Sequence, residues 1–200
     1  VESRGGDDLL GVSFELTGKK MENKMKQIII YGSEYGTARR YAERLAQLTG
    51  IPVIDYASVK ELDGCELVIY LGGLYAGGVK GLKHTVKRLP AGVKLILVTV
   101  GLADVTDPEN IRSIQNSIRR QLPPALFETA ALFHLRGGID YGQLSLPHKT
   151  MMTLLYNKAR RLPEEKKTAE DRAMIDTFNQ KVDFVDFASL EPVLKAIPKQ

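Results

Sequence analysis

A short polar segment near the start of the chain carries groups that bind phosphate. Residues 32–38 (GSEYGTA) follow an apolar run at 28–31. After the segment, apolar residues recur at helical spacing at Tyr41, Ala42, Leu45 and Leu48. This pattern predicts a buried strand that leads through a loop into a helix. The loop offers the hydroxyls of Ser33 and Thr37, the conformational freedom of Gly36 and the N–H groups at the positive end of the helix, which together favour an anion.

Two other phosphate-binding loops do not fit this segment. A Walker A loop ends in Gly-Lys-Ser/Thr, and no lysine follows Gly36. The dinucleotide pattern G-x-G-x-x-G is absent as well. The loop therefore favours a mononucleotide over a nucleoside triphosphate or NAD. One alternative stays open, in which Ser33 or Thr37 only caps the helix.

Strand-like and helix-like segments alternate along the chain and must position this loop. Apolar runs predict strands at 28–31, 53–55, 67–71, 94–100 and 130–135. Helical periodicity predicts helices at 82–89, 108–122 and 146–162, a charged linker at 164–172 and a last helix capped by Ser189. The central strands lack polar alternation, as expected when helices cover both faces of a parallel sheet. We therefore predict a doubly wound α/β fold with right-handed crossovers.

The first loop resembles the FMN-phosphate loop of the flavodoxin family. The resemblance rests on the apolar run that ends in Tyr31, on Ser33-x-x-Gly36, and on Ala42 and Leu45 in the following helix. It implies an α/β flavodoxin-like three-layer sandwich with a five-stranded parallel sheet in the order 2-1-3-4-5, and FMN as the cofactor. Family members usually have Ser or Thr two residues after the glycine, where this chain has Ala38.

Two further loops leave predicted strands at the same edge of the sheet, where ligands of such folds bind. Tyr75 in the second loop is a candidate to stack on a flavin ring. The third loop offers backbone N–H groups to the polar edge of that ring. Both loops could equally be ordinary turns, with Tyr75 packed in the core. The resemblance implies FMN contacts from Ser33, Glu34, Tyr35, Gly36, Thr37 and Ala38, from Gly73, Leu74, Tyr75, Ala76 and Gly77, and from Gly101, Leu102, Ala103 and Asp104.

The later part of the chain is similar to one branch of this family, the branch containing menaquinone-dependent protoporphyrinogen dehydrogenase (oxidase). The similarity lies in the segments 71–81, 99–110, 133–152 and 181–197. It implies an oxidoreductase of heme biosynthesis that passes electrons from a tetrapyrrole, a porphyrinogen, through FMN to a quinone. Residues 142–147 replace an aromatic-rich stretch of that branch. Arg136 and Lys149 are the candidate substrate residues, since they could pair with propionate carboxylates; the alternative is that both are exposed charges without a role.

Bulk properties limit the remaining possibilities. The 200 residues suffice for one domain, and we expect an N-terminal extension at 1–24 and an FMN-binding domain at 25–200. The single Cys65 excludes an internal disulfide, no apolar run is long enough for a membrane helix, and we expect a cytoplasmic protein. The basic face of the 146–162 helix leaves peripheral contact with the inner face of the membrane open. No nucleic-acid motif accompanies the net charge of +4.

Two alternatives to a flavin enzyme remain. One is an electron-transfer carrier that docks on a partner protein, although such carriers tend to be acidic around the flavin and this chain is basic. The other is a flavodoxin-like fold that has lost its cofactor, suggested by Ala38. No catalytic side chain is assigned, because the flavin would carry the chemistry. The spacing of His84, His134 and His148 predicts no metal site.

Overall fold

Five parallel strands form the centre of the molecule, in the order β2-β1-β3-β5-β6. The computed structural model describes residues 27–75 and 78–198. The strands are β1 (Gln27–Gly32), β2 (Val53–Asp55), β3 (Leu67–Tyr75), β5 (Lys94–Gly101) and β6 (Ala131–Arg136). A sixth strand, β4 (Gly78–Val79), pairs antiparallel with the end of β3. In chain order the parallel strands run 2-1-3-4-5, so the predicted flavodoxin-like topology is confirmed.

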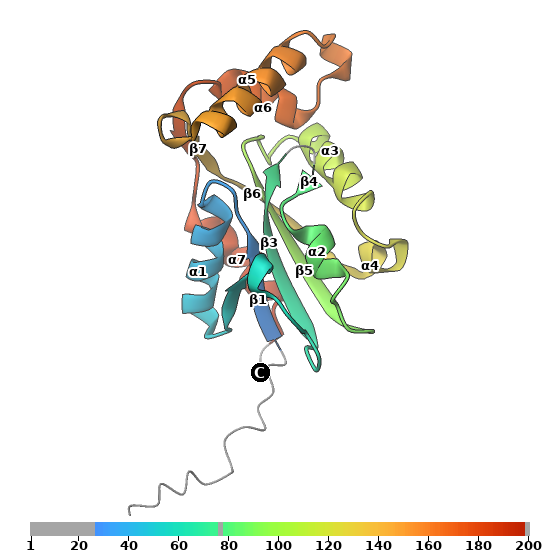
Figure 1. Ribbon diagram of the computed structural model, residues 1–200. Helices are drawn as coiled ribbons and strands as arrows, with labels where there is room; N and C mark the ends of the chain where they lie inside the picture. Colours follow the sequence, from blue (N-terminus) through green and yellow to red (C-terminus); the bar gives the residue numbers. More distant parts are fainter. Residues whose placement is uncertain (1–26, 76–77, 199–200) are drawn as a thin grey trace, which may run out of the picture.

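Helices cover both faces of this sheet and make the three layers that the sequence predicts (Figure 1). One face carries α1 (Thr37–Thr49) and α7 (Glu191–Ala196), whose apolar residues pack with Ile29, Ile69 and Val98. The other face carries α2 (Leu82–Val86), α3 (Pro108–Arg119) and α4 (Pro124–Thr129). The central strands are almost fully buried because they are covered on both sides.

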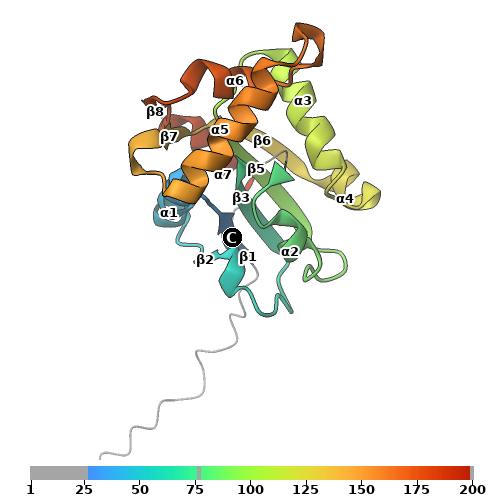
Figure 2. The ribbon, with the colours of Figure 1, turned by 45° about the horizontal axis from the view of Figure 1, so that its top comes forward.

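A third group of elements covers the carboxyl edge of the sheet (Figures 1 and 2). It comprises the helices α5 (Leu146–Arg160) and α6 (Ala169–Thr177) and the antiparallel pair β7 (Gly138–Asp140) and β8 (Lys181–Asp183). These elements have their own apolar cluster, centred on Ile139, Tyr141 and Met152. Four short 3-10 helices complete the fold at Tyr56–Ser58, Tyr141–Gln143, Glu164–Lys166 and Phe187–Leu190.

Local sequence signals explain where several helices begin and end. Helix α1 ends at Gly50, which takes a left-handed conformation with a φ of 71°. Helix α3 begins at Asp107, whose carboxylate accepts a hydrogen bond from the Glu109 N–H, and Pro108 stands in its first turn. Helix α6 begins with a capping box between Thr168 and Asp171.

Several predicted boundaries were wrong. Strand β3 continues past residue 71 to Tyr75, because its end pairs with β4; the second loop is therefore the tip of a hairpin. Helix α2 ends at Val86, before residue 89. A separate helix, α4, follows α3, because Pro124 can start a helix but cannot continue one.

Two further corrections concern the end of the chain. The predicted charged linker at 164–172 contains the start of α6, which the capping box stabilises. The N-cap of α7 is Leu190 and not Ser189, which lies in a 3-10 helix, while Pro192 stands in the first turn as expected. The predicted domain boundary at residue 24 lies outside the described residues.

No helix in residues 27–75 and 78–198 combines the length and the apolar character that a membrane span requires.

Candidate functional site

The phosphate loop lies at the carboxyl end of β1, where the chain turns into α1. Gly36 has a φ of 85°, a left-handed conformation that glycine adopts without strain. Its position is the N-cap of α1, and no side chain caps this helix end. The first N–H groups of α1 thus lack a side-chain acceptor, which leaves them suited to an anion. The alternative in which Ser33 or Thr37 caps the helix does not hold in this structure.

Ala38, where the family usually has a hydroxyl, is completely buried in the first turn of α1. Thr37 lines the cavity described below, one residue earlier in the chain. The loop therefore keeps one threonine hydroxyl and its backbone donors for a phosphate.

The loop also contains a carboxylate, Glu34, which two basic residues contact. The Lys80 ammonium lies 2.5 Å from one carboxylate oxygen, and His148 Nε2 of α5 lies 3.1 Å from the other. The Glu34 side chain is only 17% exposed, so these contacts are poorly screened by water. The hydrogen bond to Glu34 raises the pKa of Lys80, which keeps the ammonium charged. Glu34 thereby joins the phosphate loop to α5 and to the segment after β4.

Two tyrosines form an aromatic wall beside the loop. Tyr35 and Tyr75 make an edge-to-face contact with ring centroids 6.1 Å apart. The Tyr75 hydroxyl lies 3.1 Å from the sulfur of Met151 in α5. Burial and the neighbouring Tyr75 and Glu34 raise the pKa of Tyr35, so its hydroxyl keeps its proton at neutral pH. Tyr75 lines the cavity described below, and a stacking role for it stays a prediction.

The third predicted loop begins at Gly101, the last residue of β5. Leu102 packs with the cluster under α5, and Ala103 is buried. Asp104 is exposed, and hydrogen bonds from the N–H and hydroxyl of Thr106 hold the pKa of its carboxyl below the usual value. Only Gly101 and Leu102 of this loop line the cavity.

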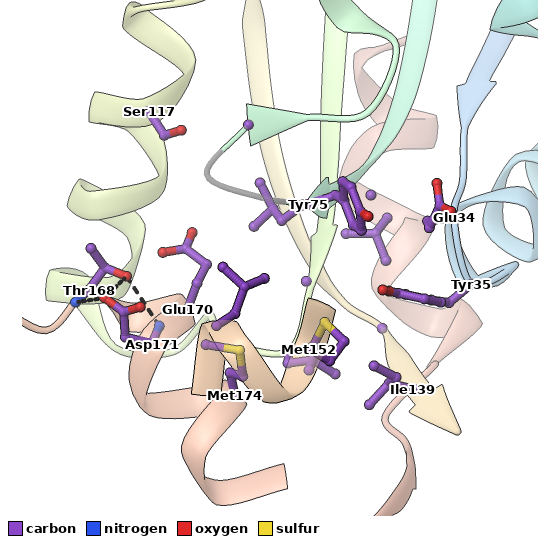
Figure 3. A pocket seen from close by; sticks show the side chains of 18 of the residues that line it. Glu34, Tyr35, Tyr75, Ser117, Ile139, Met152, Thr168, Glu170, Asp171 and Met174 are labelled. Carbon is purple, nitrogen blue, oxygen red and sulfur yellow. Dashed lines mark hydrogen bonds between the residues drawn. The ribbon is translucent and has the colours of Figure 1, made fainter. Parts of the chain in front are cut away.

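A cavity of about 430 Å³ joins all three loops beneath α5 and α6. Figure 3 shows Tyr35 and Tyr75 at one end and Thr168, Glu170 and Asp171 at the other. The lining comprises Ser33, Glu34, Tyr35, Thr37, Gly73, Leu74, Tyr75, Gly78, Val100, Gly101, Leu102, Ser113, Ser117, Arg120, Gly137, Gly138, Ile139, Met152, Leu155, Lys158, Leu162, Thr168, Glu170, Asp171 and Met174. Its volume is in the range of small-molecule and cofactor sites.

The residues present fit FMN. The hydroxyl of Tyr35 is buried without a hydrogen-bond partner in the described part of the chain, which is costly unless a ligand supplies one. At the next strand end, a Cβ on Gly137 would lie 3.0 Å from the Thr37 hydroxyl and 2.9 Å from Val100. The glycine therefore lets the chain after β6 approach Thr37 and Val100 closely. The loop donors, the aromatic wall and the cavity suit a phosphate joined to a flat ring.

The two predicted substrate residues lie elsewhere. The Arg136 guanidinium lies 3.8 Å from the centre of the Phe184 ring and donates to the Leu102 carbonyl at 3.2 Å. Lys149 is exposed, and its ammonium donates to the Gly142 carbonyl at 3.4 Å. Neither residue lines the cavity. A substrate role for them stays a prediction.

Several lining residues were not foreseen from the sequence. Gly137 and Gly138 follow β6, and this glycine pair at a strand end is a signal that could have marked a fourth loop at the same edge. Met152 comes from α5, a helix whose position above the loops no local pattern reveals. His148 of the same helix contacts Glu34 but does not line the cavity. Arg120 and Glu170 lie on α3 and α6, far apart in the sequence, and only the tertiary fold brings them to one cavity. Ala76 and Gly77, both predicted to contact FMN, lie outside the described residues.

The histidines have separate surroundings. His148 pairs with Glu34, and the Nδ1 of His134 lies 2.7 Å from the Thr99 hydroxyl. Among residues 27–75 and 78–198, no group of three or more His, Cys, Asp or Glu side chains is arranged to hold a metal ion.

Comparisons with known proteins place this geometry in a family. A family model described as a flavodoxin domain matches residues 28–166. A cysteine-to-alanine mutant of flavodoxin from Pseudomonas aeruginosa is 19% identical, with a TM-score of 0.35, over 67% of this chain and 96% of that one. Oxidised flavodoxin 1 from Bacillus cereus is 14% identical, with a TM-score of 0.36, over 55% and 84%. No curated protein matches the chain.

Proposed function

Since the chain belongs to the flavodoxin-domain family, we propose that it is an FMN-dependent oxidoreductase. Its reaction is of the protoporphyrinogen dehydrogenase type, in which a porphyrinogen gives electrons that pass through FMN to a quinone. FMN, when bound, supplies this chemistry by taking up electrons from one molecule and giving them to another.

The position of α5 and α6 is the observation that carries the proposal. A carrier that exchanges electrons with proteins works best with the edge of its ring open to the partner. Here both helices cover the carboxyl edge of the sheet and wall the cavity with Met152, Leu155 and Met174 (Figures 2 and 3). An apolar covered cavity suits a small molecule that enters beside the flavin better than it suits a docking protein.

The residues of the three loops would divide the work of holding FMN. Thr37 and the backbone N–H groups at the start of α1 would bind the phosphate. Tyr75 would pack on the ring, and the backbone after Gly101 would meet its polar edge. The Lys80 ammonium pairs with Glu34, which would lower the repulsion that a lone carboxylate exerts on a phosphate, and His148 contacts the other carboxylate oxygen.

Two measurements test this proposal. The visible absorption spectrum of the purified protein, with and without added FMN, reports whether flavin binds. Anaerobic mixing of the FMN-loaded protein with protoporphyrinogen, followed by addition of menaquinone, reports the reaction. We expect loss of the flavin absorbance at about the rate of porphyrin formation, and its return with the quinone. Failure of the porphyrinogen to bleach the flavin would contradict the proposed substrate.

The electron carrier is the second candidate, because family membership alone is compatible with it. The carrier candidate predicts that protoporphyrinogen does not reduce the flavin and that a flavodoxin reductase reduces it rapidly. A protein that neither is yellow nor takes up added FMN would contradict both candidates and favour the fold without a cofactor.

A further inference from the structure

The cavity extends beyond the three loops of the proposed flavin site. Its far end lies between α3, α5 and α6, opposite Tyr35 and Tyr75 in Figure 3. We call this region the α3–α6 end; its charged and apolar lining residues are Arg120, Lys158, Leu162, Glu170, Asp171 and Met174. Nothing in the proposed FMN contacts uses it.

Some charged side chains at this end have hydrogen-bond partners, and others have none among the described residues. Asp171 accepts hydrogen bonds from the N–H and hydroxyl of Thr168, so its carboxylate completes the cap of α6. The side chains of Arg120 and Lys158 make no ion pair or hydrogen bond with any residue in 27–75 or 78–198. Of the acidic residues in the lining, Glu170 alone also has a side chain without an ion pair or hydrogen bond to a described residue. Within the described chain, this end of the cavity therefore holds two unpaired cations and one unpaired carboxylate. The balance favours an anion.

Apolar surface adjoins these charges. Leu162 and Met174 lie at the α3–α6 end, and Met152 and Leu155 continue the wall toward the tyrosines. A ligand that suits such a wall has an apolar body, while its acidic group reaches the two cations. Arg can bind a carboxylate through two parallel hydrogen bonds, which makes it the stronger of the two recognition groups.

We propose that the α3–α6 end binds the carboxylate of an apolar substrate, and that Arg120 and Lys158 are the residues that recognise it. Arg136 and Lys149, which the sequence suggested for this role, already donate to backbone carbonyls and do not line the cavity. The proposal rests on the proposed function, because such a substrate would lie in the same cavity as FMN. Glu170 opposes the carboxylate and lowers affinity for it.

A matched pair of small probes tests the proposal on the full-length, FMN-saturated protein. The probes are 2-naphthoate and its neutral amide, 2-naphthamide, which share their apolar body and differ in charge. Dissociation constants come from ligand-observed NMR titration. We expect the wild-type protein to bind the carboxylate about tenfold more tightly than the amide, as one charge-assisted hydrogen bond allows.

Variants assign this preference to residues. Arg120→Gln and Lys158→Gln should each reduce the preference by about fivefold or more, and Glu170→Gln should increase it. Arg119→Gln and Arg160→Gln are the matched controls on α3 and α5. Arg120, Lys158 and both control residues are all exposed, and the controls differ in that they do not line the cavity. Arg119 also contacts Glu128 and Phe127. The controls should keep the wild-type preference.

Equal affinity of the wild-type protein for the two probes would overturn the proposal. Equal losses in the control and test variants would also overturn it, since they would report a general charge effect. Failure of the proposed function is read separately, from flavin absorbance and porphyrinogen oxidation. The same titration on protein without FMN still measures the preference for the carboxylate if FMN does not bind.

Discussion

Glu34 is the residue that least fits a simple anion-binding loop, and its contacts explain why the loop tolerates it. An isolated carboxylate next to a phosphate would weaken binding by repulsion. Lys80 and His148 each contact one oxygen of Glu34, so the residue serves as a link between elements. Local sequence reasoning treated Glu34 as one loop contact among six, because neither basic partner is near it in the chain.

Gly36 offers a test of the phosphate loop at the scale of one residue. Gly36→Ala should destabilise the protein by about 1 kcal/mol, since an alanine is strained at positive φ. No atom lies within 4 Å of the added Cβ, so steric overlap does not contribute. We also expect weaker FMN binding, measured by fluorescence titration, because relief of the strain shifts the loop N–H groups.

Gly50→Ala is the control for this change. Gly50 has a φ of 71° and equally open surroundings, but it lies at the other end of α1. Gly50→Ala should lower the free energy of unfolding by a similar amount and leave FMN affinity unchanged. Equal effects of the two substitutions on FMN affinity would contradict a phosphate site at Gly36.

His134 should make stability depend on pH. Burial lowers the pKa of this histidine, so the folded protein keeps the ring neutral while the unfolded chain takes up a proton near pH 6.5. The contribution of neutral His134 to the free energy of unfolding is therefore complete above about pH 6.5. It is lost as the pH falls toward the lower pKa that His134 has in the folded protein. His134→Asn should reduce the loss of unfolding free energy between pH 7 and pH 5, measured by urea denaturation.

Thr99→Val separates burial from hydrogen bonding at this site. It removes the hydroxyl that lies 2.7 Å from the His134 ring but leaves the histidine in place. The pH dependence should persist in this variant, although overall stability falls. A His134→Asn protein with the wild-type pH dependence would rule out His134 as its source.

At the scale of elements, α5 is an addition to the doubly wound sheet, because it covers the carboxyl edge of the sheet and not one of its faces (Figure 1). Its first turns contact the phosphate loop through His148 and the hairpin of β3 and β4 through Met151. Its later turns pack with α6, which in turn contacts α3. The helix thus spans the cavity.

The contacts of His148 should therefore slow release of FMN. His148→Ala removes the bond to Glu34 and the edge contact with Tyr35. We expect FMN to dissociate about fivefold faster, as the loss of roughly 1 kcal/mol implies. Stopped-flow fluorescence after dilution into a flavin-binding competitor measures this rate.

Thr150→Ala, two residues later on the same helix and exposed, is the control. The Thr150 hydroxyl bonds only to the Leu146 carbonyl within α5, and the residue is exposed. Its variant should release FMN at the wild-type rate. An unchanged rate in His148→Ala would show that this contact does not restrain the cofactor.

At the scale of the whole molecule, the described fold begins at Gln27 of β1. The sequence predicts an N-terminal extension at 1–24 that stands outside the domain. On that prediction, a protein that starts at Met25 should melt within about 2 °C of the full chain, because removal of residues outside a core changes stability little. Calorimetry measures this, and a fall of about 10 °C or more would place part of the extension in the fold.

The sheet and the loop after its first strand could be predicted from the amino-acid sequence. The runs at β1, β3 and β5 are continuous because strands buried on both faces need apolar residues throughout, so composition reveals them. Gly36 and the residues around it could also be recognised, because the turn from strand to helix imposes local requirements on residue type. The folded structure was needed to show that α5 and α6 cover this edge, that His148 contacts Glu34, and that Arg120, Lys158 and Glu170 share one cavity. These contacts join residues from distant parts of the chain, and no local pattern of residues specifies which distant partner completes them.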